Sequence, residues 1–151
     1  MKKIIYCLVL SLFIFNCSKS DDDNLPESCT TFLECNDGST WILDDDIVVI
    51  ILRINDNIND PLEQWFTIIG GADCYDYLSD ILADYTITEN TKDKLVFKAD
   101  WGAGDIQTLT FSIVNGELKI IDKYILDGEN IEDVRTLPKT TIDVDNLTIC
   151  P

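Results

Sequence analysis

The residues best able to do chemistry in this chain are its carboxylates, because the sequence holds 28 Asp and Glu residues and no histidine. The lack of histidine excludes Ser-His-Asp and Cys-His nucleophilic catalysis and histidine-ligated zinc. Catalysis by carboxylates alone, as in glycoside hydrolysis, needs two acids that face each other across a cleft. Acids lie close together at Asp44–Asp46, at Asp56 with Asp60 and at Asp73 with Asp76, and no spacing selects one pair. We therefore predict that the protein is not an enzyme.

The loop Asp56-Asn57-Ile58-Asn59-Asp60 gathers the hard oxygen atoms that Ca²⁺ prefers. It lacks the regularly spaced acids, the glycine and the distal Glu of an EF-hand loop. The alternative interpretation is a turn in which Asn and Asp side chains bind their own backbone. We favour the turn, and we predict no metal site and no cofactor.

The first 17 residues have the form of an export signal. Met1-Lys2-Lys3 is a cationic start, an apolar run follows from Ile4 to Phe15, and Cys17 comes two residues later. The run is shorter than the roughly 20 apolar residues that span a bilayer, and its form is typical of a secretory signal peptide. Because a cysteine follows in place of a small-residue cleavage site, the segment resembles a bacterial lipoprotein signal, which is cut just before a cysteine that then carries lipid. This resemblance implies a signal peptide at 1–16 and a membrane anchor on Cys17.

An acidic run follows the lipidation site. The sequence Ser20-Asp21-Asp22-Asp23 resembles the surface-export tag of Bacteroidota lipoproteins, and the alternative is a plain solvated linker. The resemblance implies a protein that is lipid-anchored in the bacterial outer membrane and exposed at the cell surface. We expect residues 17–28 to form a lipidated acidic tether and residues 29–151 to form a single domain.

The net charge of the chain limits the classes of molecule that it can bind. The formal net charge is −17 at pH 7. Such a surface repels the phosphates of nucleic acids, so we predict no nucleic-acid partner. The same surface would attract a basic protein partner.

Four cysteines follow the predicted lipidation site, namely Cys29, Cys35, Cys74 and Cys150. An even number of cysteines in an exported chain predicts two disulfides, and the sequence leaves all three connectivities open. A four-cysteine metal site is disfavoured, because the paired close spacings of such sites are missing. Cys150 is next to the end of the sequence, so we expect one bridge to tie this end to the body of the domain.

Short apolar and alternating runs predict β structure through most of the domain, after one or two helical turns within 29–35. The predicted strands span residues 41–43, 47–54, 63–69, 74–78, 85–89, 94–101, 109–114, 117–120 and 133–137. The strongest local signal is Asn115-Gly116, the sequence of a two-residue type I′ hairpin, which would place Val114 opposite Glu117 and Phe111 opposite Ile120. A second turn is predicted at Asp127-Gly128. Eight or nine strands without crossover helices indicate an all-β antiparallel meander, folded as a barrel or as a β-sandwich, with a short N-terminal helix.

The order of these segments resembles that of the lipocalin-like lipoproteins of Bacteroidota. The shared features are the lipoprotein signal, the acidic tether, a short helix, the element Asp37-Gly38-Ser39-Thr40-Trp41 and the run of meander strands. In lipocalins a Gly-x-Trp element near the first strand closes the bottom of the barrel, and here Gly38 and Trp41 are one residue further apart. The resemblance covers residues 29–137 and implies a small lipocalin-like up-and-down barrel that holds a ligand.

The candidate ligand-lining residues are aromatic: Trp41, Trp65, Tyr75 and Trp101. Aromatic residues in a β domain of this size also serve as plain core, and that alternative stays open. An eight-stranded barrel is just wide enough to be filled by side chains or to hold one small molecule. We therefore predict a non-enzymatic protein that binds a small apolar or amphipathic ligand. The alternative is an acidic protein-interaction module, such as an inhibitor, an immunity protein or a cell-surface accessory protein, which a filled interior would favour.

Overall fold

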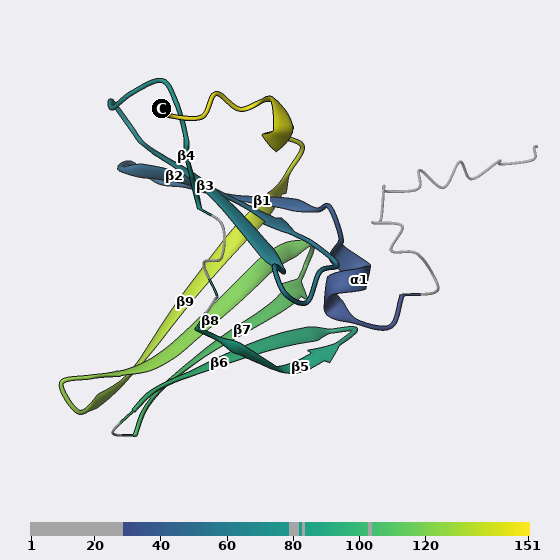
Figure 1. Cartoon of the computed structure of the whole chain (residues 1–151), viewed down its shortest axis with the longest axis vertical. Helices are drawn as coiled ribbons and strands as arrows, with labels where there is room; N and C mark the ends of the chain where they lie inside the picture. Colours follow the sequence, from purple (N-terminus) through teal and green to yellow (C-terminus); the bar gives the residue numbers. More distant parts are fainter. Residues whose placement is uncertain (1–28, 79–81, 83, 103) are drawn as a thin grey trace, which may run out of the picture.

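The computed structural model of the chain describes residues 29–78, 82, 84–102 and 104–151 (Figure 1). The predicted signal peptide, the tether, Cys17 and the run from Ser20 to Asp23 lie outside these residues. The described elements are α1 (Phe32–Asn36), β1 (Thr40–Asp44), β2 (Val48–Ile54), β3 (Leu62–Ile68), β4 (Asp76–Leu78), β5 (Thr86–Thr91), β6 (Lys94–Gly102), β7 (Asp105–Val114), β8 (Glu117–Leu126), β9 (Glu129–Thr140) and the short 3₁₀ helix η1 (Val144–Asn146). No helix within the described ranges has the length and apolar character that crossing a membrane requires.

The strands form one antiparallel sheet in the order β4-β3-β2-β1-β9-β8-β7-β6-β5. Strands that follow each other in the chain are neighbours, except that β4 and β5 are the two edges. The first strand also pairs with the last, at Thr40 with Thr140 and Trp41 with Lys139. The described strands therefore follow the order of an up-and-down ring that is open between β4 and β5. The all-β antiparallel meander predicted from the sequence is confirmed.

The sheet is strongly curved, so it has a concave face and a convex face. In Figure 1, β2 and β3 lie on one side, β5 and β6 lie on the other, and the long strands β7–β9 join them. The inner face between these two sides is the concave face. The convex face of β1–β3 is covered by the segment 141–150.

The two predicted hairpins are present. Asn115 and Gly116 have φ angles of 54° and 79°, as a type I′ turn requires, and Val114 pairs with Glu117 and Phe111 with Ile120, as predicted. Asp127-Gly128 forms a second turn of the same kind, with φ angles of 52° and 82°.

The last strand is longer than predicted and continues through Pro138 to Thr140. Proline is accommodated because the ladder between β9 and β1 covers Thr140 and Lys139 and does not continue to Pro138, which has no backbone N–H to donate.

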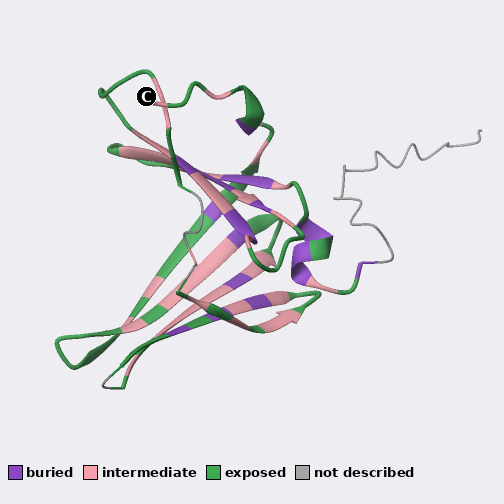
Figure 2. Cartoon of the chain, in the orientation of Figure 1, coloured by how far each residue is buried: buried purple, intermediate pink, exposed green. Residues whose placement is uncertain are grey.

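One end of the sheet is closed by α1. The backbone N–H of Phe32 donates to the side-chain oxygen of Asn90 on β5 at 2.9 Å, and the Cys29–Cys35 disulfide pins the segment around the helix. Phe32 and Leu33 then enter the main core, where both are essentially inaccessible to solvent. The main core consists of Phe32, Leu33, Trp41, Leu52, Ile54, Leu62, Leu95, Phe97, Phe111, Leu118 and Leu137. Figure 2 shows buried residues gathered at α1 and the adjoining strand halves, whereas the far tips of β6–β9 are mostly exposed.

The segment 141–150, which we call the strap, crosses the convex face. A second core lies beneath it, in which Ile51 and Trp65 pack with Val144 of η1. The strap ends at the Cys74–Cys150 disulfide, beside backbone hydrogen bonds from Tyr75 to Thr148 and from Cys150 to Tyr75. The two expected disulfides are thus confirmed, and the structure selects one of the three connectivities that the sequence left open.

Candidate binding site

The concave face carries a cavity of about 270 Å³ between its two sides, which we call the apolar cavity. Most of its walls are aliphatic or aromatic side chains from β1–β3 and β7–β9. Leu82 and Tyr85, from the connection between β4 and β5, complete it. The lining residues are Leu43, Ile50, Leu52, Leu62, Gln64, Leu82, Tyr85, Gln107, Leu109, Phe111, Ile120, Asp122, Arg135 and Leu137.

The register of β7, β8 and β9 determines which side chains enter this cavity. Phe111 lies opposite Ile120, and Ile120 lies opposite Arg135. Because side chains alternate between the faces of a strand, the next inward pair is Leu109 with Asp122. The inward face therefore changes from apolar to polar along the strands, away from the end that α1 closes.

A second cavity of about 270 Å³, the polar cavity, continues from the apolar one toward the strand tips. Its lining residues are Trp101, Asp105, Gln107, Asp122, Tyr124, Ile125, Asp133 and Arg135. Three residues, Gln107, Asp122 and Arg135, line both cavities. The boundary between the apolar and polar parts of the concave face is made by these three side chains.

Hydrogen bonds hold the boundary side chains in place. The Nε2 of Gln107 donates to both carboxylate oxygens of Asp122, at 2.9 and 3.0 Å. The indole N–H of Trp101 points at the Oε1 of Gln107 from 3.4 Å. Arg135 donates from both Nε and a terminal nitrogen to Asp133, at 3.1 and 2.8 Å. We call Trp101, Gln107, Asp122, Asp133 and Arg135 the inner polar cluster.

Tyr85 joins the inner polar cluster to the apolar cavity. Its ring meets that of Trp101 edge to face, with centroids 6.0 Å apart. Partial burial raises the pKa of the Tyr85 hydroxyl, and the negative charges of Asp122 and Asp84 raise it further. The carboxylate of Asp122 therefore acts electrostatically on the tyrosine at the cavity wall.

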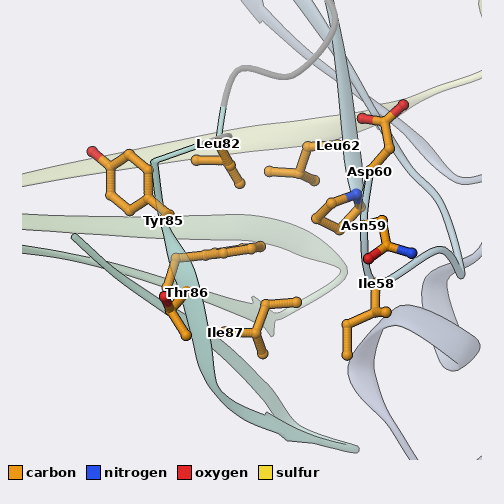
Figure 3. A pocket seen from close by; sticks show the side chains of 10 residues that line it. Ile58, Asn59, Asp60, Leu62, Leu82, Tyr85, Thr86 and Ile87 are labelled. Atoms are coloured by element: carbon orange, nitrogen blue, oxygen red, sulfur yellow. The ribbon is translucent and has the colours of Figure 1, made fainter.

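A third opening, the side cleft, lies between the β2–β3 loop and β5 and has a volume of about 450 Å³. Figure 3 shows Leu82 and Tyr85 on one side of it, Ile87 and Thr86 below, and Leu62 with Asp60 on the other side. Leu62, Leu82 and Tyr85 also line the apolar cavity. The side cleft and the apolar cavity therefore share a wall.

The four aromatic residues proposed from the sequence as ligand-lining residues lie in different parts of the fold. Trp101 is half exposed and lines the polar cavity. Trp41 is buried in the main core. Trp65 and Tyr75 belong to the second core, on the convex face beneath the strap. The structure thus brings Trp101 to the cavities, and it places the other three where the plain-core interpretation would have them.

Sequence reasoning missed Gln107, Asp122 and Arg135, although a signal was present. The Asn115-Gly116 turn sets the β7–β8 register, and extending it by a few residues places Asp122 opposite Leu109 on the inward face. The Asp127-Gly128 turn does the same for Arg135. Polar residues at inward positions of a β domain depart from the apolar pattern of a core, and such departures are expected at functional sites.

A second polar group was also missed, on the convex side of β2–β4. Glu63 accepts hydrogen bonds from Arg53 at 2.7 Å, Asn55 at 2.9 Å and Tyr77 at 2.8 Å. Arg53 also pairs with Asp145 at 2.9 Å. We call Arg53, Asn55, Glu63, Tyr77 and Asp145 the outer polar cluster.

Packing and charge together fix the outer polar cluster. The guanidinium of Arg53 lies over the ring of Trp65, 5.2 Å from its centroid, and the rings of Trp65 and Tyr77 are also 5.2 Å apart. Burial alone would raise the pKa of Glu63, and its three hydrogen bonds with the charge of Arg53 outweigh this and lower it. The bond to Glu63 raises the pKa of Tyr77 to about 12.

The carboxylate pairs considered for catalysis have ordinary local roles where their bonds are seen. Asp45 accepts the backbone N–H groups of Ile47 and Val48 at 2.8 Å each. In the loop considered for calcium, the side chain of Asn57 accepts the N–H of Asn59 at 3.1 Å, as in the turn interpretation. Among the residues that the structure describes, no group of three or more His, Cys, Asp or Glu side chains is placed to hold a metal ion.

Comparisons with known proteins find no match to this chain, whether among protein-family models, curated protein sequences or solved structures. The resemblance to lipocalin-like lipoproteins stays a prediction.

Proposed function

We propose that this protein is a surface-exposed, lipid-anchored outer-membrane lipoprotein of lipocalin-like type that binds a small amphipathic molecule on its concave face. The observation that carries the proposal is the junction of the apolar and polar cavities at Gln107, Asp122 and Arg135. Ligand sites are typically apolar hollows with a few placed polar groups, which is the composition found here. A molecule lying across the junction buries its apolar part against Leu109 and Phe111 and leaves its polar part beside the inner polar cluster.

The same observation bears on the alternative of an acidic protein-interaction module. A sheet whose interior is filled by side chains favours that alternative, and cavities along the concave face favour a ligand. The net charge of −17 suits a basic partner, but it selects no surface of the domain. Ligand binding is therefore the function that the geometry supports best.

A neutral fluorescent probe tests the proposal. The chain from residue 18 onward, exported behind a cleavable signal so that its disulfides form, is titrated with N-phenyl-1-naphthylamine. We expect saturable binding with one site. Replacing Leu109 by Trp fills the apolar cavity that this residue lines and should weaken binding at least about tenfold, since an occupied cavity has no room for the probe.

The neighbouring residue supplies a matched control. Thr110 faces the opposite side of β7 and is absent from the cavity walls, so Thr110→Trp adds the same bulk without filling the cavity. Its affinity for the probe should equal that of the wild type. Absence of saturable binding in the wild type, or equal affinity in Leu109→Trp, would count against a ligand site here and favour the protein-interaction module.

The membrane anchor is tested separately. Cells expressing the full chain are fed an alkyne fatty acid, and we expect label on the wild type and none on the Cys17→Ala variant. Digestion of intact cells with an added protease should remove the domain if it faces outward. A labelled protein that survives on intact cells would support the lipid anchor and contradict surface exposure.

A further inference from the structure

We propose that the polar part of the ligand is a cation, an alkylammonium group that docks between the rings of Tyr85 and Trp101 and the carboxylate of Asp122. We call these three residues the ammonium subsite. This inference rests on the proposed function, because it names the head group of the amphipathic molecule placed on the concave face.

The first argument is the balance of charge around the polar cavity. Its walls carry three carboxylates, Asp105, Asp122 and Asp133, and one guanidinium, Arg135. Arg135 forms an ion pair with Asp133 at 2.8 Å. The donor bound to Asp122 is the neutral amide of Gln107. In the described part of the chain, Asp122 thus has its hydrogen bonds from Gln107 but forms no ion pair of its own, and the nearby Arg135 is paired with Asp133.

The second argument is the aromatic pair. Tyr85 comes from the connection before β5 and Trp101 comes from β6, and their rings meet edge to face with centroids 6.0 Å apart. The π face of an aromatic ring attracts ammonium groups, and Trp attracts them most strongly. Aromatic faces beside a carboxylate therefore favour a positive head group, particularly one with methyl groups. The raised pKa of Tyr85, to which burial contributes most and Asp122 next, is consistent with the negative field at this point.

The third argument is the path from head group to tail. Asp122 and Tyr85 also line the apolar cavity, so a chain attached to the ammonium group passes directly to Leu109 and Phe111. An anionic head group has a poorer fit. It would find Arg135 already paired with Asp133 and would face the carboxylates of Asp122 and Asp105 in the same cavity.

Three ligands with the same ten-carbon chain test the sign of the head group: decyltrimethylammonium, decanol and decanoate, each well below its micelle concentration. Each is used to displace N-phenyl-1-naphthylamine from the chain beginning at residue 18. The ammonium compound should displace the probe at about tenfold lower concentration than decanol, from one partly screened ion pair and a cation–π contact. Decanoate should be the weakest, and the preference for the cation should fall as salt is added.

Two substitutions separate this subsite from the general acidity of the protein. Asp122→Asn removes the charge and keeps an oxygen for Gln107, so the preference for the cation over decanol should drop several-fold while decanol binds as before. Asp93→Asn removes the same charge from the exposed turn before β6, outside the cavity walls, and should leave the preference unchanged.

The outcomes distinguish the two proposals. Equal displacement by all three ligands, or a preference that survives in Asp122→Asn, overturns the ammonium subsite and leaves the ligand site standing. Strongest displacement by decanoate also overturns it and assigns the head group to Arg135. Failure of every ligand to displace a bound probe, or of the probe to bind, overturns the proposed function as well.

Discussion

The outer and inner polar clusters contain similar residue types and are built for different ends. In the outer cluster Glu63 is largely buried, and its two oxygens are bound by Arg53, Asn55 and Tyr77. In the inner cluster Asp122 is bound by one neutral amide and borders two cavities. A saturated carboxylate contributes to the fold, whereas a carboxylate with a cavity before it can also contribute to binding. The difference in pairing, more than the presence of charge, distinguishes the candidate site from the outer polar cluster.

The largest effect should come from releasing the strap, which covers the second core and supplies Asp145 to the outer polar cluster. The Cys74–Cys150 bridge closes a span of 76 residues and Cys29–Cys35 a span of 6. Chain-entropy arguments then give about 4 kcal/mol of stability lost for Cys74→Ser with Cys150→Ser, and about 2 kcal/mol for Cys29→Ser with Cys35→Ser. Urea denaturation of both double variants measures the two losses.

The strap variant also shows whether the two faces are independent. Because the strap packs on Trp65 and not on the concave face, Cys74→Ser with Cys150→Ser should expose tryptophan to quenchers and leave probe affinity unchanged. Loss of probe binding in a variant that is still folded would show that the convex face supports the cavities. The concave and convex faces would then not be independent of each other.

The next effect compares the two carboxylates directly. Glu63→Gln leaves Arg53 beside a neutral amide and keeps the shape of the side chain, and a broken charge-assisted bond of this kind costs about 2 kcal/mol. Asp122→Asn keeps its acceptor for Gln107 and should change the free energy of unfolding by about 0.5 kcal/mol or less. Equal losses in urea denaturation would mean that Asp122 is as structural as Glu63.

The pH dependence of stability sharpens the role of Glu63. Its folded-state pKa lies below the ordinary value of 4.5, so the ionised group stabilises the fold at all pH values above this range. That stabilisation is lost as the pH falls through the lowered folded-state pKa. The difference in unfolding free energy between the wild type and Glu63→Gln should therefore be constant near neutral pH and shrink below about pH 4.5. A difference that does not change down to about pH 3 would assign the effect to shape rather than charge.

These contrasts also show what the sequence could predict. The Asn115-Gly116 turn fixes its own register through backbone conformation, so the pairing of Val114 with Glu117 follows from local sequence alone. The same logic reaches Asp122, because the β7–β8 ladder continues without a register shift from the turn to the pair of Leu109 and Asp122. The position of the inner polar cluster could therefore be predicted from the sequence. The candidate ligand-lining residues proposed from the sequence were aromatic residues instead.

The outer polar cluster was not predictable in the same way. Arg53 and Glu63 are joined by a seven-residue loop, 55–61, whose length sets no register, and their pairing is known from the folded ladder. Tyr77 comes from a three-residue strand at the sheet edge, and Asp145 comes from the strap. Contacts between segments so far apart depend on the curvature of the sheet and on the disulfide, neither of which a local pattern encodes.

The smallest loss that we predict for the outer polar cluster is at Tyr77, one of its exposed members. Tyr77→Phe removes one of the hydrogen bonds to Glu63 and keeps the ring that packs on Trp65. Because Tyr77 is 40% exposed, the loss of stability should be about 0.5–1 kcal/mol. The hydrogen bond also lowers the pKa of Glu63, so its removal should move that pKa up toward the ordinary value and narrow the pH range in which Glu63 stabilises the fold.

Carbon-detected NMR titration of the Glu63 carboxyl group measures this shift, with Tyr124→Phe as a control outside the outer cluster. An upward shift in Tyr77→Phe and none in Tyr124→Phe would show that the bonds on Glu63 act as one saturated set. An unchanged pKa in Tyr77→Phe would mean that Arg53 and Asn55 hold Glu63 without the tyrosine. Glu63 would then resemble Asp122 more closely than its geometry indicates, because each carboxylate would depend on only some of the polar groups around it.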